Sequence, residues 1–176
     1  MATNSIVMGL AALVFCTWAV SLAGIAALQD ECEPGWSTGL SGINGLSSGL
    51  PCMKLFRYYW FIVSLEAALI FGLAIAMAAG ALTKTRLGWM ALFGVATLLY
   101  IQMTDTFLTM WSLTESAEGA LKHRTRTMVA GALMTSAVNC MLLFALGMSP
   151  EEGKATVQLQ QAPAPVEEVT QKANAV

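Results

Sequence analysis

Two long apolar runs separated by only four residues constrain the fold of this chain more than any other feature. The runs cover residues 58–82 and 87–111, and each is 25 residues long. An apolar helix needs about 20 residues to cross a bilayer. The segment between them, residues 83–86 (TKTR), is too short for anything except a tight turn. The sequence therefore predicts an antiparallel transmembrane hairpin.

Two further apolar runs, residues 6–28 and 128–148, bring the predicted number of spans to four. For the first run the alternative is a cleaved signal peptide, although such peptides have a basic start and a shorter apolar core. Charged residues make up 11% of the chain, against about 25% in soluble domains. The predicted class is an all-α, four-helix transmembrane bundle in contact with the lipid bilayer. Residues 149–176, rich in Pro, Ala, Gln and Glu, are predicted to be a disordered tail.

A polar loop that contains two cysteines connects the first two predicted spans. Its Gly, Ser, Asn and Pro residues are turn formers, and the leucine and isoleucine residues between them favour a lid over the helix ends. Cys32 and Cys52 bracket this loop. Such a pair predicts a disulfide if the loop faces an oxidising compartment. The alternative is two free thiols on a cytosolic loop.

The second predicted span has a small residue at every fourth position. Residues four apart share one helix face, and in lipid a seam of small side chains lets another helix approach closely. The seam therefore predicts a packing surface, either within the chain or between subunits. Its members are Ser64, Ala68, Gly72, Ala76 and Gly80.

Two acidic residues, Glu66 and Asp105, interrupt the central hairpin. At 1.5 Å per residue, both lie roughly 24–27 Å from the predicted turn, so their carboxylates share nearly one membrane level. Acids inside a membrane are functional candidates by default. We expect Asp105 to pair with a third-loop arginine or with neighbours such as Gln102, so Asp105→Asn should destabilise the bundle and Glu66→Gln should hardly affect folding. The alternative is that both acids reach interfacial water separately. Asn139, in the fourth span, is expected to bond across helices.

Four spans, a cysteine-bearing first loop and an acid in the third span resemble the MARVEL superfamily. The nearer resemblance is to its plant Casparian-strip-membrane-domain-like branch, whose intramembrane aspartate in span three is matched by Asp105. The branch also has an arginine in span one, and residues 6–28 contain no cation. The resemblance implies a non-enzymatic scaffold that oligomerises and organises a membrane patch.

The chemistry of the chain limits its possible functions. It contains no Gly-rich phosphate loop, and its single histidine, His123, excludes sites that need two imidazoles from one protomer. The sequence therefore predicts no enzyme, no catalytic residue, no cofactor and no metal site. With a net charge of −2, it also predicts no nucleic-acid partner.

The first hypothesis is an oligomeric membrane scaffold, with copies of itself or other membrane subunits as partners. The alternative is an ion- or proton-handling protein, or a small subunit of a transport or electron-transfer complex, that uses Glu66 and Asp105. An integral-membrane enzyme is a third possibility.

Two signals for the orientation in the membrane disagree. The first and third loops carry five Lys and Arg residues, against three near the membrane in the termini and the second loop. Positive charge favours the cytoplasm, which would place those two loops inside. A long Gly-rich loop bracketed by cysteines suits the outer face instead. On that ground we expect cytoplasmic termini and a location in the plasma membrane.

Overall fold

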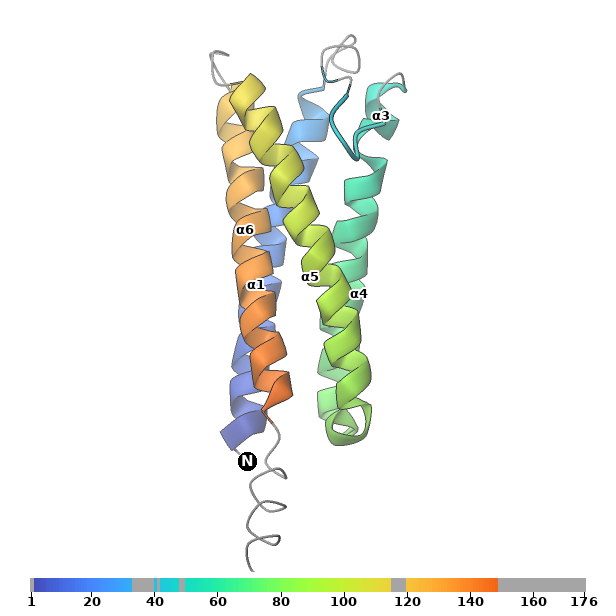
Figure 1. Ribbon diagram of the computed structural model, residues 1–176, viewed down its shortest axis with the longest axis vertical. Helices are drawn as coiled ribbons and strands as arrows, with labels where there is room; N and C mark the ends of the chain where they lie inside the picture. The colour runs from blue at the N-terminus through green and yellow to red at the C-terminus, as the bar shows by residue number, and fades with distance from the viewer. Residues whose placement is uncertain (1, 33–39, 41, 48–49, 115–119, 149–176) are drawn as a thin grey trace, which may run out of the picture.

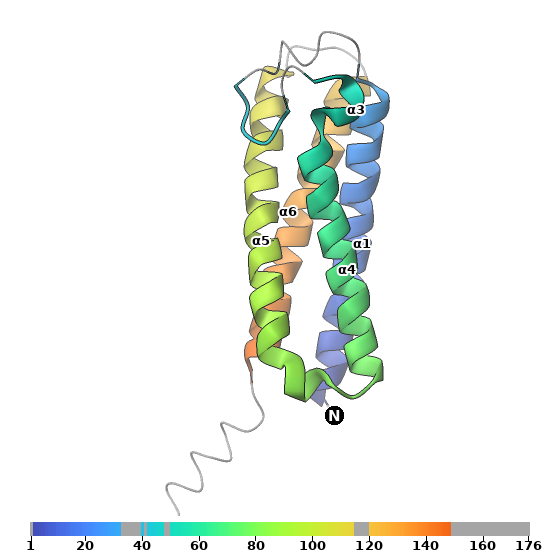
Figure 2. The ribbon, with the colours of Figure 1, turned by 90° about the vertical axis from the view of Figure 1, so that its right-hand side faces the viewer.

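Four long helices lie side by side along the molecule in the computed structural model, as Figure 1 and Figure 2 show. In chain order they are α1 (Ala2–Asp30), α4 (Arg57–Ala78), α5 (Leu82–Leu113) and α6 (Ala120–Gly147), with a one-turn helix, α3 (Cys52–Leu55), before α4. The N-terminus and the end of α6 lie at the same end of the bundle (Figure 1), here named the terminal end.

The structure describes residues 2–32, 40, 42–47, 50–114 and 120–148. Within them, each of the four long helices is long and apolar enough to cross a membrane, and no strand occurs. These findings confirm the predicted all-α, four-helix transmembrane class. The predicted tail, residues 149–176, lies outside the described residues.

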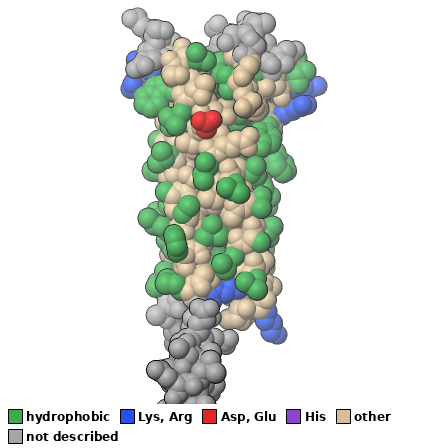
Figure 3. Space-filling model, viewed as in Figure 1, with side chains coloured by type: hydrophobic (Ala, Val, Ile, Leu, Met, Phe, Trp, Pro, Cys, Tyr) green, Lys and Arg blue, Asp and Glu red, His purple; other side chains and the backbone are tan. Residues whose placement is uncertain are grey.

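The outer wall of the bundle has the chemistry of a lipid-facing surface. Large apolar side chains are exposed along it, among them Phe71, Leu98 and Phe144. Figure 3 shows hydrophobic side chains over the length of one face, with Lys and Arg side chains confined to its two ends. This distribution places the apolar band in the hydrocarbon core and the cations at the level of the headgroups.

The turn of the central hairpin lies earlier in the chain than predicted. Residues 83–86 form the first turn of α5, so α4 is shorter than the predicted span. Gly80 ends α4 with a positive φ of 66°. Its N–H bonds to the carbonyl of Met77, and the N–H of the next residue bonds to the carbonyl of Ala76. This is the Schellman cap, which favours glycine because the left-handed conformation costs it nothing.

The other helices extend beyond their predicted spans, and two arginines cap helix ends. Residues 120–127, which precede the predicted fourth span, form the start of α6. There Arg124 donates to the carbonyl of Ala27, at the end of α1, with an N···O distance of 2.8 Å. It also pairs with Glu31 at 2.8 Å. At the terminal end, Arg86 donates to the carbonyl of Leu146, at the end of α6. Each cation thus satisfies carbonyls that helix geometry leaves unpaired.

The closest approach of two helices is between α1 and α6. A Cβ atom added to Gly131 would lie 2.7 Å from the backbone nitrogen of Ser21, and one added to Gly24 would lie 2.8 Å from the Cα of Met128. Both distances are shorter than a Cβ tolerates, so these glycines allow the two backbones to meet. The tight small-residue interface is therefore formed by α1 and α6.

The small-residue seam predicted on α4 does not form a continuous packing surface within the chain. Ser64 and Ala68 are exposed, and Ala76 is half-buried. Gly80 lies in the turn. Gly72 does pack closely, because an added Cβ would lie 2.7 Å from the indole ring of Trp89 on α5. Only the middle of the seam therefore serves packing inside the bundle.

The described part of the first loop, residues 40, 42–47 and 50–52, lies at the end of the bundle opposite the termini, here named the lid end. Cys32 and Cys52 form a disulfide, with Cα atoms 5.7 Å apart. A loop of this length closed by a disulfide gains roughly 3 kcal/mol in the chain-entropy model. The described lid residues include Leu46, which is buried, and Asn44. The Asn44 carbonyl accepts hydrogen bonds from the hydroxyl of Tyr59 at 2.8 Å and from that of Thr106 at 3.2 Å.

Candidate functional site: a buried polar layer

A layer of buried polar side chains separates two apolar cores inside the bundle. One core lies toward the lid end and contains Ile25, Phe56 and Phe107. The other lies toward the terminal end and contains Val7 and Leu73. On each helix, polar side chains occur where one core gives way to the other. This polar layer consists of Thr17 and Ser21 on α1, Glu66 on α4, Thr97 and Tyr100 on α5, and Thr135 and Asn139 on α6.

The hydroxyl groups of the layer are largely satisfied within their own helices. Thr135 donates to the carbonyl of Gly131 at 2.8 Å, and its hydroxyl lies 3.3 Å from that of Ser21. The Thr17 hydroxyl donates to a carbonyl of α1, three residues earlier. Just above Glu66, the indole of Trp18 donates to the carbonyl of Val63 at 2.8 Å and connects α1 to α4. Two contacts at this level therefore join helices: Ser21 with Thr135 connects α1 to α6, and Trp18 with Val63 connects α1 to α4.

Three side chains of the layer have buried polar atoms without a hydrogen-bond partner among the described residues. They are the two carboxyl oxygens of Glu66, the hydroxyl of Tyr100, and both amide atoms of Asn139. Asn139 lies beside Glu66, and Tyr100 lies near both Glu66 and Ser21. A buried polar group without a partner costs about 1–3 kcal/mol, and more if it is charged. Five such atoms in one place indicate a role in function rather than in stability.

Asp105 does not belong to the polar layer, and the prediction that it shares nearly one membrane level with Glu66 is wrong. Because α5 begins at Leu82, Asp105 lies more than one helical turn beyond Tyr100 toward the lid end. Its side chain is exposed on the outer wall. Within the described residues it forms no salt bridge, because Arg124 pairs with Asp30 and Glu31 instead. Arg126 lies over the ring of Trp111, 5.2 Å from its centroid. The expected pairing of Asp105 with a third-loop arginine is therefore wrong.

The neighbours expected to donate to the Asp105 carboxylate also have other partners. Gln102 accepts from the hydroxyl of Tyr58 at 3.3 Å, and Thr109 donates to the backbone carbonyl of Asp105 at 3.1 Å. Neither contact holds the carboxylate. We therefore withdraw the expectation that Asp105→Asn destabilises the bundle.

Sequence reasoning identified Glu66 and Asn139 as intramembrane polar residues but did not join them. It missed Tyr100. One available signal was the recurrence of a polar side chain near the middle of every span. That signal becomes specific only when the position of the hairpin turn and the face of each helix are known, because the predicted turn at residues 83–86 put Asp105 at the level of Glu66.

Comparison with known proteins supports the fold. No protein-family model matches the chain, and no curated protein matches its sequence. The structure is similar to the crystal structure of the Chlamydomonas reinhardtii LCI1 channel, with a TM-score of 0.70 and 17% sequence identity. The match covers 83% of this chain and 96% of that one. This chain is an integral membrane protein. The MARVEL resemblance has no family match to support it and stays a prediction.

Proposed function

We propose that the bundle is a channel-like protein that passes protons or small cations, with Glu66 as the central group on the pathway. The observation that carries this proposal is the buried Glu66 carboxyl without a hydrogen-bond partner, in a polar layer to which all four helices contribute. An acid on a narrow pathway favours cations. The structural neighbour is itself described as a channel, which supports the same class of function.

The two apolar cores act as gates in this proposal. Phe56 and Phe107 stack with their ring centroids 6.3 Å apart on the lid side of the layer, and Leu73 and Phe93 are fully buried on the other side. Hydrophobic constrictions of this kind stop ions by excluding water. Conduction then requires both cores to open or to admit a short chain of water. A carboxyl, a phenol and an amide suffice to relay or bind a cation, so the proposal includes no enzymatic step.

The flux prediction compares the two acids directly. In proteoliposomes that contain a pH-sensitive dye, the wild-type protein should pass protons, and Glu66→Gln should reduce the rate by about tenfold or more, equivalent to about 1.4 kcal/mol in the barrier. Asp105→Asn is the control, because it also removes one carboxylate from the central hairpin, but one that is exposed on the outer wall. It should keep the wild-type rate. Equal losses in the two variants, or no protein-dependent flux of protons or monovalent cations, would remove Glu66 from a pathway.

We also propose that the protein lies in the plasma membrane with cytoplasmic termini. The disulfide between Cys32 and Cys52 supports this orientation, because disulfides form and persist on the oxidising side of a membrane. Two cations of the lid end are engaged within the protein, Arg124 with carboxylates and Arg57 with the hydroxyl of Ser47. Their engagement weakens the count of positive charges that favours the opposite orientation.

A second candidate function is the oligomeric scaffold, and one observation favours it. Ser64 and Ala68 present small side chains on the outside of α4, where a second copy could approach closely. We expect the protein to run as a homo-oligomer in mild detergent, and Ala68→Leu to shift it to monomer in size-exclusion chromatography with light scattering. The control is Ala91→Leu, at an exposed position on α5. A monomeric wild-type protein, or equal shifts in both variants, would argue against this interface.

A further inference from the structure

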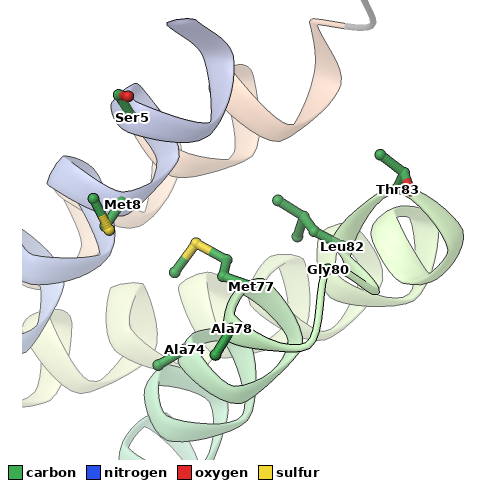
Figure 4. Close-up of a pocket in the computed structure, with 8 residues that line it drawn as sticks. All are labelled: Ser5, Met8, Ala74, Met77, Ala78, Gly80, Leu82 and Thr83. Carbon is green, nitrogen blue, oxygen red and sulfur yellow. The ribbon is translucent and has the colours of Figure 1, made fainter. Parts of the chain in front are cut away.

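A cavity opens at the terminal end of the bundle, away from the polar layer. Its volume is about 400 Å³, within the range of about 300–1,000 Å³ that is usual for small-molecule sites. It lies between the start of α1, the end of α4 and the turn into α5, and Figure 4 shows Met77 reaching from α4 toward Met8 on α1. The lining includes Met8, Ala74, Met77, Ala78, Leu82 and Thr83.

The cavity exists because α4 is loosely packed at this end. Ala74 and Ala78 carry only a methyl group as side chain, and both residues are exposed. The hydrogen bond that joins α1 to α4, from Trp18 to Val63, lies several turns away toward the lid end. Apart from Ser5 and Thr83 the walls are therefore apolar, and they are adaptable, since methionine side chains are flexible. Such a surface suits a flexible hydrocarbon chain.

The charges around the cavity favour an anionic headgroup. Lys84 is exposed and follows Thr83, which lines the cavity. Its neighbour Arg86 is already bound to carbonyls of α6. The acids of the described residues, in contrast, lie in the polar layer or toward the lid end. At this level a lysine side chain extends toward lipid phosphates, and each such cation contributes attraction to anionic lipid.

We propose that this cavity binds an anionic phospholipid, with one acyl chain between α1 and α4 and the phosphate beside Lys84. The apolar walls along the helices match the acyl chain of the lipid, and the cation at the helix ends matches its phosphate. The proposal is independent of conduction through the polar layer. It also agrees with cytoplasmic termini, because the cytoplasmic leaflet carries the anionic lipids.

The test uses the full chain in detergent with phosphatidylglycerol or phosphatidylcholine of identical acyl chains, and native mass spectrometry reads the lipid bound. The wild-type protein should prefer phosphatidylglycerol, and Lys84→Gln should reduce that preference by about fivefold, the effect of one cation near a lipid surface. Ala78→Phe fills the cavity and should lower the binding of both lipids. Lys54→Gln, which removes an exposed cation at the lid end, should change nothing.

Three results would overturn the proposal. The first is equal binding of the two lipids by the wild-type protein. The second is unchanged phosphatidylglycerol binding by Ala78→Phe. The third is an equal loss of preference in Lys54→Gln and Lys84→Gln, which would mean a general attraction to the protein surface. Should Ala78→Phe not fold, Ala74→Phe fills the same cavity from one helical turn away.

Discussion

The Glu66→Met variant is expected to be more stable than the wild-type protein and to lose proton flux. Methionine is similar to glutamate in length and fills irregular apolar space well. The substitution removes two buried oxygens that have no hydrogen-bond partner among the described residues. Relief of that cost should raise the free energy of unfolding by about 1–3 kcal/mol. Thermal midpoints in detergent and flux in proteoliposomes measure the two effects on one preparation.

Glu66→Gln is the companion variant, because it removes the charge and keeps the polar shape. An amide beside Asn139 still has unmet hydrogen-bonding capacity, so we expect stability close to wild type together with the loss of flux. A lower thermal midpoint for Glu66→Met would show that the carboxyl has partners that hold the four helices together. The polar layer would then be structural, and the basis for the channel proposal would be lost.

The second large effect is expected from Gly131→Ala, a change of one methyl group. The new Cβ would lie 2.7 Å from the backbone nitrogen and 2.9 Å from the Cα of Ser21. Both atoms belong to the main chain of α1, so the two helices must separate. We expect a loss of about 1–3 kcal/mol, as for other overpacked interiors. A lower thermal midpoint would report it.

The same substitution at Gly94 provides the control. No atom lies within 4 Å of a Cβ added there, and alanine favours a helix over glycine by up to about 1 kcal/mol. Gly94→Ala should therefore be neutral or stabilising. If both variants shift the thermal midpoint in the same direction, the contact between α1 and α6 is not as close as the structure has it.

The number of helices could be predicted because a helix that crosses a bilayer must be an apolar run of about 20 residues, and such runs are visible in the sequence. The ends were harder to place. Residues 120–127 are polar and resemble a loop, yet they continue α6 because Arg124 finds carbonyl and carboxylate partners at the end of α1. Gly80 lies in an alanine-rich run, so the sequence did not indicate that it caps the end of α4.

The candidate site could be predicted only in part, because these helices are apolar on all sides. A soluble helix has an apolar stripe that shows which residues face the core. No such stripe distinguishes Glu66 from Asp105. Counting residues also put the two acids at one level, which is wrong because the turn lies at residues 79–81 and not at 83–86. The polar neighbours of Glu66 come from α5 and α6, and Tyr100 and Asn139 lie near it only through the packing of the whole bundle.

The two arginine caps also fix the distance between the two cationic ends of the bundle, which can be compared with the thickness of a membrane. Both involve α6: Arg124 projects from near its start, and Arg86 holds the carbonyl of Leu146 near its end. Leu146 is 22 positions after Arg124, which corresponds to about 33 Å of helix. The hydrocarbon core of a sterol-rich plasma membrane is about 32–33 Å thick, against about 27 Å in the endoplasmic reticulum. Both cations can therefore reach headgroups at the same time in the thicker bilayer. In a thinner bilayer, either the bilayer would have to stretch or the bundle would have to tilt.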